Sequence, residues 1–328
     1  MKLGTLKNPT RRDGDLVVVS RDTQTAVRAG HIAPSLREAI ENWVDAEPRL
    51  QELYAQLNSG NAAGSFAVDT TQFHSPLPRA FQWLDGSAFI QHVKLVRKAR
   101  NAPLPEGLLT DPLMYQGCSD AFLAPTQDIP LIDDSLGVDF EGEIAVITDD
   151  VPMGIKAENV APHCKLVVLV NDVSLRGAIP AELQKGFGFL VSKPASAFSP
   201  FAVTPDELGD AWQNGRLNLD LDVSYNNEFY GNPNGEAMHF NFYELLAHAA
   251  QTRVLAAGTI LGSGTVSNED TARGSSCLAE KRMLEKIETG AFITPFMKDG
   301  DTIRISMKDH NGKDIFGVID QKVTKVHL

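Results

Sequence analysis

The stretch that decides the fold is DFEGEIAV at residues 139–146, together with the run LVVLVND at residues 166–172. Both are rich in aliphatic and β-branched residues with no helical period, so each predicts a β-strand. Side chains two apart in a strand point to the same face, so Glu141 and Glu143 should present their carboxylates side by side. Asp172, at the end of the second predicted strand, could supply a third carboxylate.

Like charges held this close need a counter-charge. Hard divalent cations such as Mg²⁺ and Ca²⁺ take carboxylate oxygens as ligands. A solvated strand face would also explain a lone Glu-x-Glu. The acidic pair here is embedded in apolar sequence, and a further acid ends the next strand, which favours a metal site.

Composition limits the classes of function. The chain has 328 residues, 43% hydrophobic and 22% charged, which predicts one large domain and a smaller one. Its formal net charge of −12 argues against a nucleic-acid surface. The aliphatic run at 166–170 is far shorter than the about 20 residues that span a bilayer, and Lys7, Pro9 and Arg11 interrupt any signal peptide. We therefore expect a soluble, cytoplasmic protein with no nucleic-acid or membrane partner.

Three cysteines, Cys118, Cys164 and Cys277, lie far apart and show no Cys-x-x-Cys spacing. No histidine stands near any of them at a local motif spacing. Free, mostly buried thiols in a reducing cytoplasm are the expectation.

A boundary is predicted near residue 75. Before it come a strand at 15–20 and a helix, capped by Ser35, with apolar positions from 36 to 57. Residues 58–64 are rich in Asn, Gly and Ala, and SPLP at 75–78 forces extended backbone. We expect a small strand-and-helix domain at 1–75 and a catalytic domain at 76–328.

The second part is predicted to be β-rich. Short strands are expected at 142–148, 165–171, 217–225, 259–261, 302–307 and 315–323, with a helix at about 241–255. This spacing favours an α+β fold with a curled sheet or barrel over a doubly wound α/β fold. The GSG at 262–264 lacks the third glycine of a dinucleotide fingerprint, so a tight turn near the site is expected instead.

His92 differs from the other histidines because it follows Asp85 by seven residues, in WLDGSAFIQH at 83–92. A neutral imidazole there could take a proton from water, as general-base chemistry near pH 7 requires. A purely structural histidine is the alternative that spacing alone leaves open.

Taken together, five segments resemble the fumarylacetoacetate hydrolase family, in family order over about residues 77–324. They are DGSAFIQH at 85–92, FEGE at 140–143, NDVSLR at 171–176, GFLVSK at 188–193 and LGSGTVS at 261–267. The resemblance, to bacterial members with an extra N-terminal domain, implies a distorted mixed β-roll with flanking helices. It also implies a homodimer.

The resemblance assigns a metal site and catalytic groups. Glu141, Glu143 and Asp172 match metal-binding carboxylates, Asp85 matches a fourth ligand, and the ion would be Mg²⁺ or Ca²⁺, with Mn²⁺ as an alternative. His92 matches the base that activates water.

Further residues are matched around that base. Glu280 would orient His92 and fix its tautomer. Arg176 and Lys193 match cations that stabilise an oxyanion. Tyr115 and Thr265 match residues that contact the substrate's carboxylate or carbonyl groups.

Several positions depart from the family pattern. A glutamine expected three residues after Arg176 is Ile179, with Gln184 further on, and tyrosines expected near 87 and 183 are Ser87 and Leu183. The match also needs one-residue insertions before Lys193 and before Glu280. The substrate is therefore the least determined part of the resemblance.

The activity that the resemblance implies is hydrolysis of a carbon–carbon bond in a 1,3-diketo acid. Fumarylacetoacetate, cleaved to fumarate and acetoacetate in tyrosine catabolism, is the leading substrate. A decarboxylase, tautomerase or hydratase of 2-keto acids is the second hypothesis. A catalytically silent dimer that binds a metabolite is the third.

Overall fold

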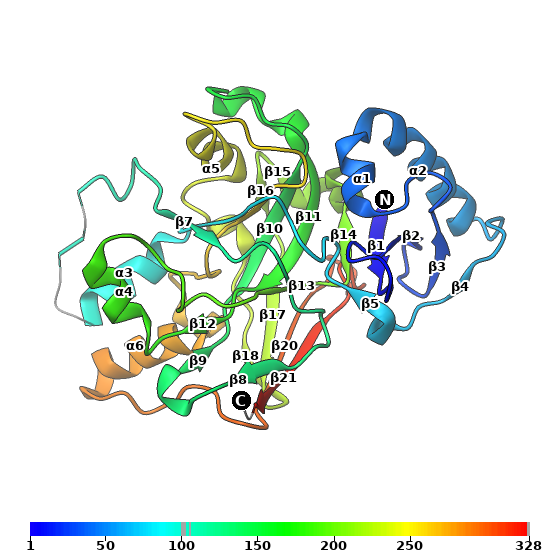
Figure 1. The fold of residues 1–328 in the computed structure, drawn as a ribbon. Helices are drawn as coiled ribbons and strands as arrows, with labels where there is room; N and C mark the ends of the chain where they lie inside the picture. Colours follow the sequence, from blue (N-terminus) through cyan, green and yellow to red (C-terminus); the bar gives the residue numbers. More distant parts are fainter. Residues whose placement is uncertain (100–102, 105, 327–328) are drawn as a thin grey trace.

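The computed structural model describes residues 1–99, 103–104 and 106–326. The fold is a mixed α+β arrangement dominated by strands (Figure 1). In the described part of the chain, no helix combines the length and the apolar character that a bilayer crossing needs. The α-helices are α1 (Leu36–Glu41), α2 (Trp43–Asn58), α3 (Ile90–Ala99), α4 (Ile179–Lys185), α5 (Phe242–Ala249) and α6 (Leu278–Thr289).

The larger sheet has twelve strands and runs in the order β4-β3-β2-β1-β14-β11-β10-β19-β6-β7, with β5 on β1 and β13 on β11. Its strands are β1 (Lys2–Leu6), β2 (Asp15–Val19), β3 (Thr25–Arg28), β4 (Phe66–Ala67), β5 (Phe73–His74), β6 (Trp83–Gly86), β7 (Met114–Gly117), β10 (Gly142–Thr148), β11 (Cys164–Asn171), β13 (Ala197–Phe198), β14 (Phe201–Val203) and β19 (Ile260–Gly262). Most pairs are antiparallel, but β19 and β6 run parallel. The sheet is therefore mixed.

A second sheet of five strands has the order β18-β17-β20-β21-β8. Its strands are β8 (Ile129–Leu131), β17 (Leu221–Tyr225), β18 (Glu228–Gly231), β20 (Thr302–Met307) and β21 (Ile319–Lys325), and two short pairs join β9 (Val138–Asp139) to β12 (Ser174–Leu175) and β15 (Trp212–Gln213) to β16 (Arg216–Leu217). Over the described residues, neither large sheet closes on itself. The predicted α+β class is confirmed, as an open rolled sheet rather than a barrel.

The larger sheet crosses the predicted boundary near residue 75. Strand β1 pairs with β2 on one side and with β14 on the other, where Lys2 lies opposite Val203. Leu50 of α2 belongs to the same buried apolar cluster as Val168 and Phe198. Figure 1 shows α1 and α2 beside the N-terminal strands, at one end of this continuous sheet. The division into 1–75 and 76–328 stays a prediction about chain organisation.

Two predicted helices differ in extent from the observed ones. The helix expected from 36 to 57 begins after Ser35, which accepts a hydrogen bond from the Glu38 amide, but it is interrupted at Asn42. Asn42 leaves helical geometry (φ −123°, ψ 40°), and its side chain donates to the Glu38 carbonyl. The helix expected at 241–255 is α5, which begins at a capping box and ends at Ala249.

The stretch at 139–146 is not one strand. β9 ends at Asp139 and β10 begins at Gly142, so Glu141 lies in the break between them. The sequence pattern also predicts neither α3 nor α6, which pack against each other. These differences matter because His92 lies on α3 and Glu280 on α6.

Candidate active site

Three buried carboxylates meet where the central strands end. Asp85 lies on β6, Glu143 on β10, and Asp172 follows β11, and one oxygen from each lies within 4.8 Å of the others. The strand order β11-β10-β19-β6 explains the convergence, because these strands are neighbours in one sheet. Gly264 closes the site: its amide donates to Asp85 at 3.0 Å, and at φ +76° a side chain would collide with the carbonyl of Gly86. The predicted tight turn at 262–264 is therefore beside this group.

The electrostatics of the three carboxylates fit a divalent cation. Burial and the nearby Asp172 raise the pKa of Asp85 to about 8. Burial and Asp85 raise the pKa of Glu143 well above its ordinary value. Within the described residues, neither carboxylate oxygen of Glu143 has a hydrogen-bond partner. Three buried carboxylates that lie this close together, one of them without any donor in the described part of the chain, are suited to a hard cation such as Mg²⁺ or Ca²⁺.

Glu141, predicted to share this group, has cationic and hydroxyl neighbours. The Lys193 ammonium donates to it at 2.7 Å and the Ser174 hydroxyl at 2.5 Å, and the Thr265 hydroxyl donates to its other oxygen. Lys193 also donates to Asp172 at 2.5 Å. Lys193 therefore lies between Glu141 and Asp172 and contacts both carboxylates. Glu141 and Glu143, expected to share one environment, have different neighbours. The role of Glu141 as a metal ligand stays a prediction.

Arg176 is held by an acid that the sequence pattern did not single out. Its Nε donates to Asp139 at 2.8 Å, and its Nη2 lies 3.3 Å from Glu141. Asp139 also accepts the amides of Leu278 and Ala279, at 2.8 and 3.0 Å, in the first turn of α6. Asp139 therefore fixes both Arg176 and the helix that carries Glu280. It lies inside the stretch that decides the fold, but only the tertiary contact reveals its function.

The predicted base and its partner meet across two helices. His92 Nδ1 lies 3.1 Å from Glu280 Oε2, with the histidine side chain 19% exposed and the glutamate 3% exposed. Cys277 Sγ accepts the Glu280 amide and so caps α6. Cys164 and Cys277 are buried, Cys118 is partly buried, and all three are free, which confirms the predicted thiols.

Tyr115 and Lys193 cover the acidic group. The Tyr115 hydroxyl donates to Asp172 at 2.6 Å, and the Lys193 ammonium lies 5.0 Å from the Tyr115 ring centroid. Burial alone would lower the pKa of Lys193, but Asp172 and Glu141 raise it above its ordinary value. Lys193 is thus a permanent cation at the site.

Glu182, also not predicted as a site residue, organises the segment that leads to Lys193. Its carboxylate accepts the amides of Leu190, Val191 and Ser192. The Ser192 hydroxyl bond holds the pKa of Glu182 at about 2. The carboxylate is therefore an ionised clamp on this loop at neutral pH.

A cavity of about 180 Å³ joins these groups. The predicted residues that line it are Asp85, His92, Tyr115, Glu141, Arg176, Lys193 and Thr265. Ser87 and Ile179, two departures from the family pattern, line it as well. Gln184 is exposed on α4, so the wall at Ile179 is apolar where the family pattern has an amide.

Comparisons with known proteins agree with this geometry. A family model described as "Fumarylacetoacetate (FAA) hydrolase C-terminal" matches residues 82–324, and one described as "Fumarylacetoacetase N-terminal domain 2" matches residues 1–79. The chain belongs to the fumarylacetoacetate hydrolase family. It is therefore an enzyme of the fumarylacetoacetate hydrolase scaffold.

Relatives in this family carry different names. The rat mitochondrial oxaloacetate tautomerase Fahd2a is 28% identical over 254 residues, which is 66% of this chain and 78% of that protein. A solved putative HpcE protein from Mycobacterium smegmatis superposes with a TM-score of 0.68 at 18% identity, covering 100% of both chains. A maleylpyruvate hydrolase from Sphingobium sp. SYK-6 superposes with a TM-score of 0.67 at 16% identity, covering 99% of this chain and 100% of that one. These structures show the shared fold.

Proposed function

We propose that the protein is a divalent-cation-dependent enzyme that hydrolyses a carbon–carbon bond in a 1,3-diketo acid, with fumarylacetoacetate as the leading substrate. The observation that carries the proposal is the buried group of Asp85, Glu143 and Asp172 beside the His92–Glu280 pair. The three carboxylates can hold a cation, and the His92–Glu280 pair can move a proton.

Asp85, Glu143 and Asp172, together with the predicted ligand Glu141, would hold the ion, whose charge would polarise the dicarbonyl group of the substrate. Mg²⁺ or Ca²⁺ suits these oxygen donors, and Mn²⁺ is an alternative. The remaining steps fall to side chains of the chain itself.

His92 would take a proton from water. With Glu280 accepting from Nδ1–H, the free lone pair is on Nε2, so this nitrogen is the base. The water oxygen bonds to the substrate carbonyl carbon, whose oxygen becomes negative near Lys193 and Arg176. The carbon–carbon bond then breaks, its electron pair stays on the leaving keto fragment, and the proton on His92 returns to that carbon. Water is consumed, and two carboxylic acids are released.

Substitution of His92 separates proton transfer from ion binding. His92→Ala should lower kcat by about 100- to 10,000-fold, as expected for loss of a general base. The affinity for Mg²⁺, measured by calorimetry, should stay within a few-fold of the wild type. Loss of the ion in this variant would contradict the assignment, because His92 is paired with Glu280 and not with the acidic group.

A keto acid tautomerase is the second candidate. It is favoured by the named activity of the rat relative and by Ile179, which places an apolar wall where a polar donor is expected. In that reaction His92 would move a proton without attack by water. Decarboxylation and hydration of 2-keto acids would use the same groups.

Product analysis decides among these reactions. Fumarylacetoacetate, an acylpyruvate and oxaloacetate would each be incubated with enzyme and Mg²⁺, Ca²⁺ or chelator, and products followed by NMR. Cleavage products support hydrolysis; enol–keto exchange alone supports a tautomerase. No turnover of any acid with either ion would indicate the silent metabolite-binding protein. A homodimer in the cytoplasm, acting in aromatic compound catabolism, is part of the proposal and is testable by light scattering and fractionation.

A further inference from the structure

A second cavity opens directly from the catalytic one. It has a volume of about 380 Å³ and lies between α4 and α6, and it shares His92, Arg176, Ile179 and Phe189 with the catalytic cavity. The catalytic cavity alone, at about 180 Å³, is smaller than the roughly 300–1,000 Å³ of ordinary ligand pockets. A substrate longer than its reacting dicarbonyl group must therefore extend into the neighbouring space.

Arg282 of α6 is the cation that lines this second cavity without also lining the catalytic one, whereas Arg176 lines both. The guanidinium carbon of Arg282 lies 4.1 Å from the ring centroid of Phe296 and 4.9 Å from that of Phe292, and this side chain donates to the Thr294 carbonyl. Across the described ranges, no carboxylate lies within ion-pair distance of it. The two rings hold the guanidinium in place while most of its N–H donors stay available. A positioned, half-buried arginine with unused donors suits a carboxylate ligand.

We infer that the cavity between α4 and α6 receives the far end of the substrate, and that Arg282 binds a carboxylate at that end. The inference rests on the proposed function for the reacting end, which the ion and Lys193 would hold. Where the two cavities meet, the apolar side chains of Val93, Ile179 and Phe189 line the wall beside His92 and Arg176. The substrate class is therefore a keto acid with a hydrocarbon middle and a second, terminal carboxylate.

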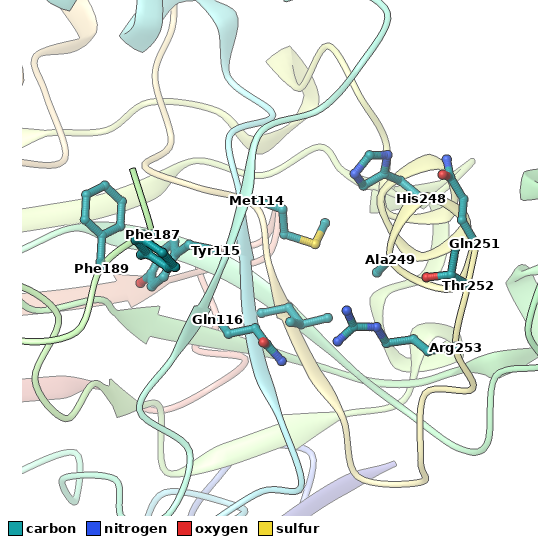
Figure 2. Close-up of a pocket in the computed structure, with 12 residues that line it drawn as sticks. Met114, Tyr115, Gln116, Phe187, Phe189, His248, Ala249, Gln251, Thr252 and Arg253 are labelled. Atoms are coloured by element: carbon teal, nitrogen blue, oxygen red, sulfur yellow. The ribbon is translucent and has the colours of Figure 1, made fainter. Parts of the chain in front are cut away.

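A third cavity offers a contrasting arginine. It has a volume of about 600 Å³ and touches the catalytic cavity at Tyr115 and Phe189. Figure 2 shows Arg253 on the side away from these two residues, with Met114 and Gln116 between them. Arg253 is exposed and borders neither His92 nor Arg176. It is the matched control for Arg282.

Two keto acids that lack the 1,3-dicarbonyl group of the proposed substrate test the inference by binding. 2-Oxoadipate and 2-oxohexanoate have equal numbers of carbon atoms and differ in whether the far end is a carboxylate or a methyl group. Calorimetric titration of the full-length protein with Mg²⁺ should show roughly 10- to 100-fold tighter binding of 2-oxoadipate, as expected for a charged hydrogen-bonded contact.

Variants then locate the preference. Arg282→Gln should bring the two affinities to within about 3-fold of each other, by weakening 2-oxoadipate alone, and Arg282→Lys should keep part of the preference because it keeps the charge. Arg253→Gln should behave as the wild type. Unchanged binding of 2-oxohexanoate in Arg282→Gln shows that the cavity is still formed.

Three outcomes would overturn the inference: no preference for 2-oxoadipate in the wild type, persistence of the preference in Arg282→Gln, or equal loss for both acids in that variant. The last would mean that Arg282 shapes the cavity and does not bind a carboxylate. Failure of the proposed hydrolysis is a different result, seen as absence of cleavage products while the binding preference remains.

Discussion

Glu141 and Glu143 are separated by a single glycine, yet they have opposite surroundings. Glu141 accepts hydrogen bonds from Lys193, Ser174 and the Thr265 hydroxyl. Glu143 is fully buried, and in the part of the chain that the structure describes its oxygens have no donor. One carboxylate already has its counter-charge, and the other lacks one.

The pKa directions express the same contrast. Burial alone would raise both values, but Arg176 and Lys193 hold the pKa of Glu141 below its ordinary range. Glu143 faces the carboxylates Asp85 and Asp172, and its pKa is raised. The comparison teaches that two neighbouring acids in a sequence can have different tasks: one side chain binds Lys193 and Arg176, and the other is the one that we propose as a metal ligand.

The largest effect is expected from Glu143→Gln. It removes a charge from the predicted ion site, so Mg²⁺ affinity should fall by more than about 100-fold, beyond the range for outer contacts to a metal ligand, and turnover should be lost. The metal-free protein should become more stable, because the buried glutamate must either repel Asp85 and Asp172 or take up a proton, and glutamine does neither. Calorimetry and thermal unfolding measure both, with exposed Glu288→Gln as control. Wild-type ion affinity in Glu143→Gln would remove the basis of the proposed function.

Glu141→Gln should have the reverse effect on the metal-free protein. Lys193 and Arg176 would lose a buried counter-charge, which costs about 3 kcal/mol or more of unfolding free energy. Denaturant unfolding with chelator present measures this loss. A destabilisation no greater than that of Glu288→Gln would contradict the contrast. An additional fall in Mg²⁺ affinity, comparable with that of Glu143→Gln, would establish Glu141 as one of the metal ligands that the family resemblance implies.

Local pattern was sufficient for much of this fold. Runs of β-branched residues predicted β2, β10 and β11, because burial on both faces leaves an aliphatic signature. The resemblance to the family indicated His92 and Glu280 as partners. Nδ1 of His92 lies 3.1 Å from Oε2 of Glu280, although the two residues are 188 positions apart in the sequence. Their catalytic roles remain predictions.

The division between Glu141 and Glu143 could not be predicted from alternation. It depends on the break before β10 and on the contact with Lys193, which is 52 residues from Glu141 in the sequence. Asp139 was missed for a similar reason, since its partners on α6 lie about 140 residues further along the chain. Contacts between distant segments leave no local period.

Stability of the metal-free protein should fall as the pH rises. Asp85 has a folded-state pKa of about 8 against an ordinary 3.8, so the folded state keeps a proton that the unfolded chain has lost. The stabilisation is complete below about pH 4 and is lost as the pH approaches 8, at about 1.4 kcal/mol per pKa unit. Glu141 has a lowered pKa, so its contribution to stability increases as the pH rises, but only at acidic pH, below its ordinary pKa.

Scanning calorimetry between pH 5 and 8 measures this dependence. With chelator, the midpoint temperature of thermal unfolding should fall as the pH rises. With Mg²⁺ the fall should be smaller, because the ion takes the place of the protons at the carboxylates. A flat metal-free profile would mean that the folded protein does not hold a proton on Asp85 more tightly than the unfolded chain does.

The smallest effects should come from two serines, one of which donates to Glu141 and the other to the acidic group that contains Glu143. Ser174 donates to Glu141 at 2.5 Å, and Ser196 donates to Asp172 at 2.7 Å. Ser174→Ala should cost about 1 kcal/mol of unfolding free energy and leave Mg²⁺ affinity unchanged, since Lys193 still holds Glu141. Ser196→Ala should lower Mg²⁺ affinity by about 10-fold, because it frees a predicted ligand to rotate. Equal changes in both variants would mean that the four carboxylates act as one unit, and the contrast between the neighbouring glutamates would then describe only the metal-free state.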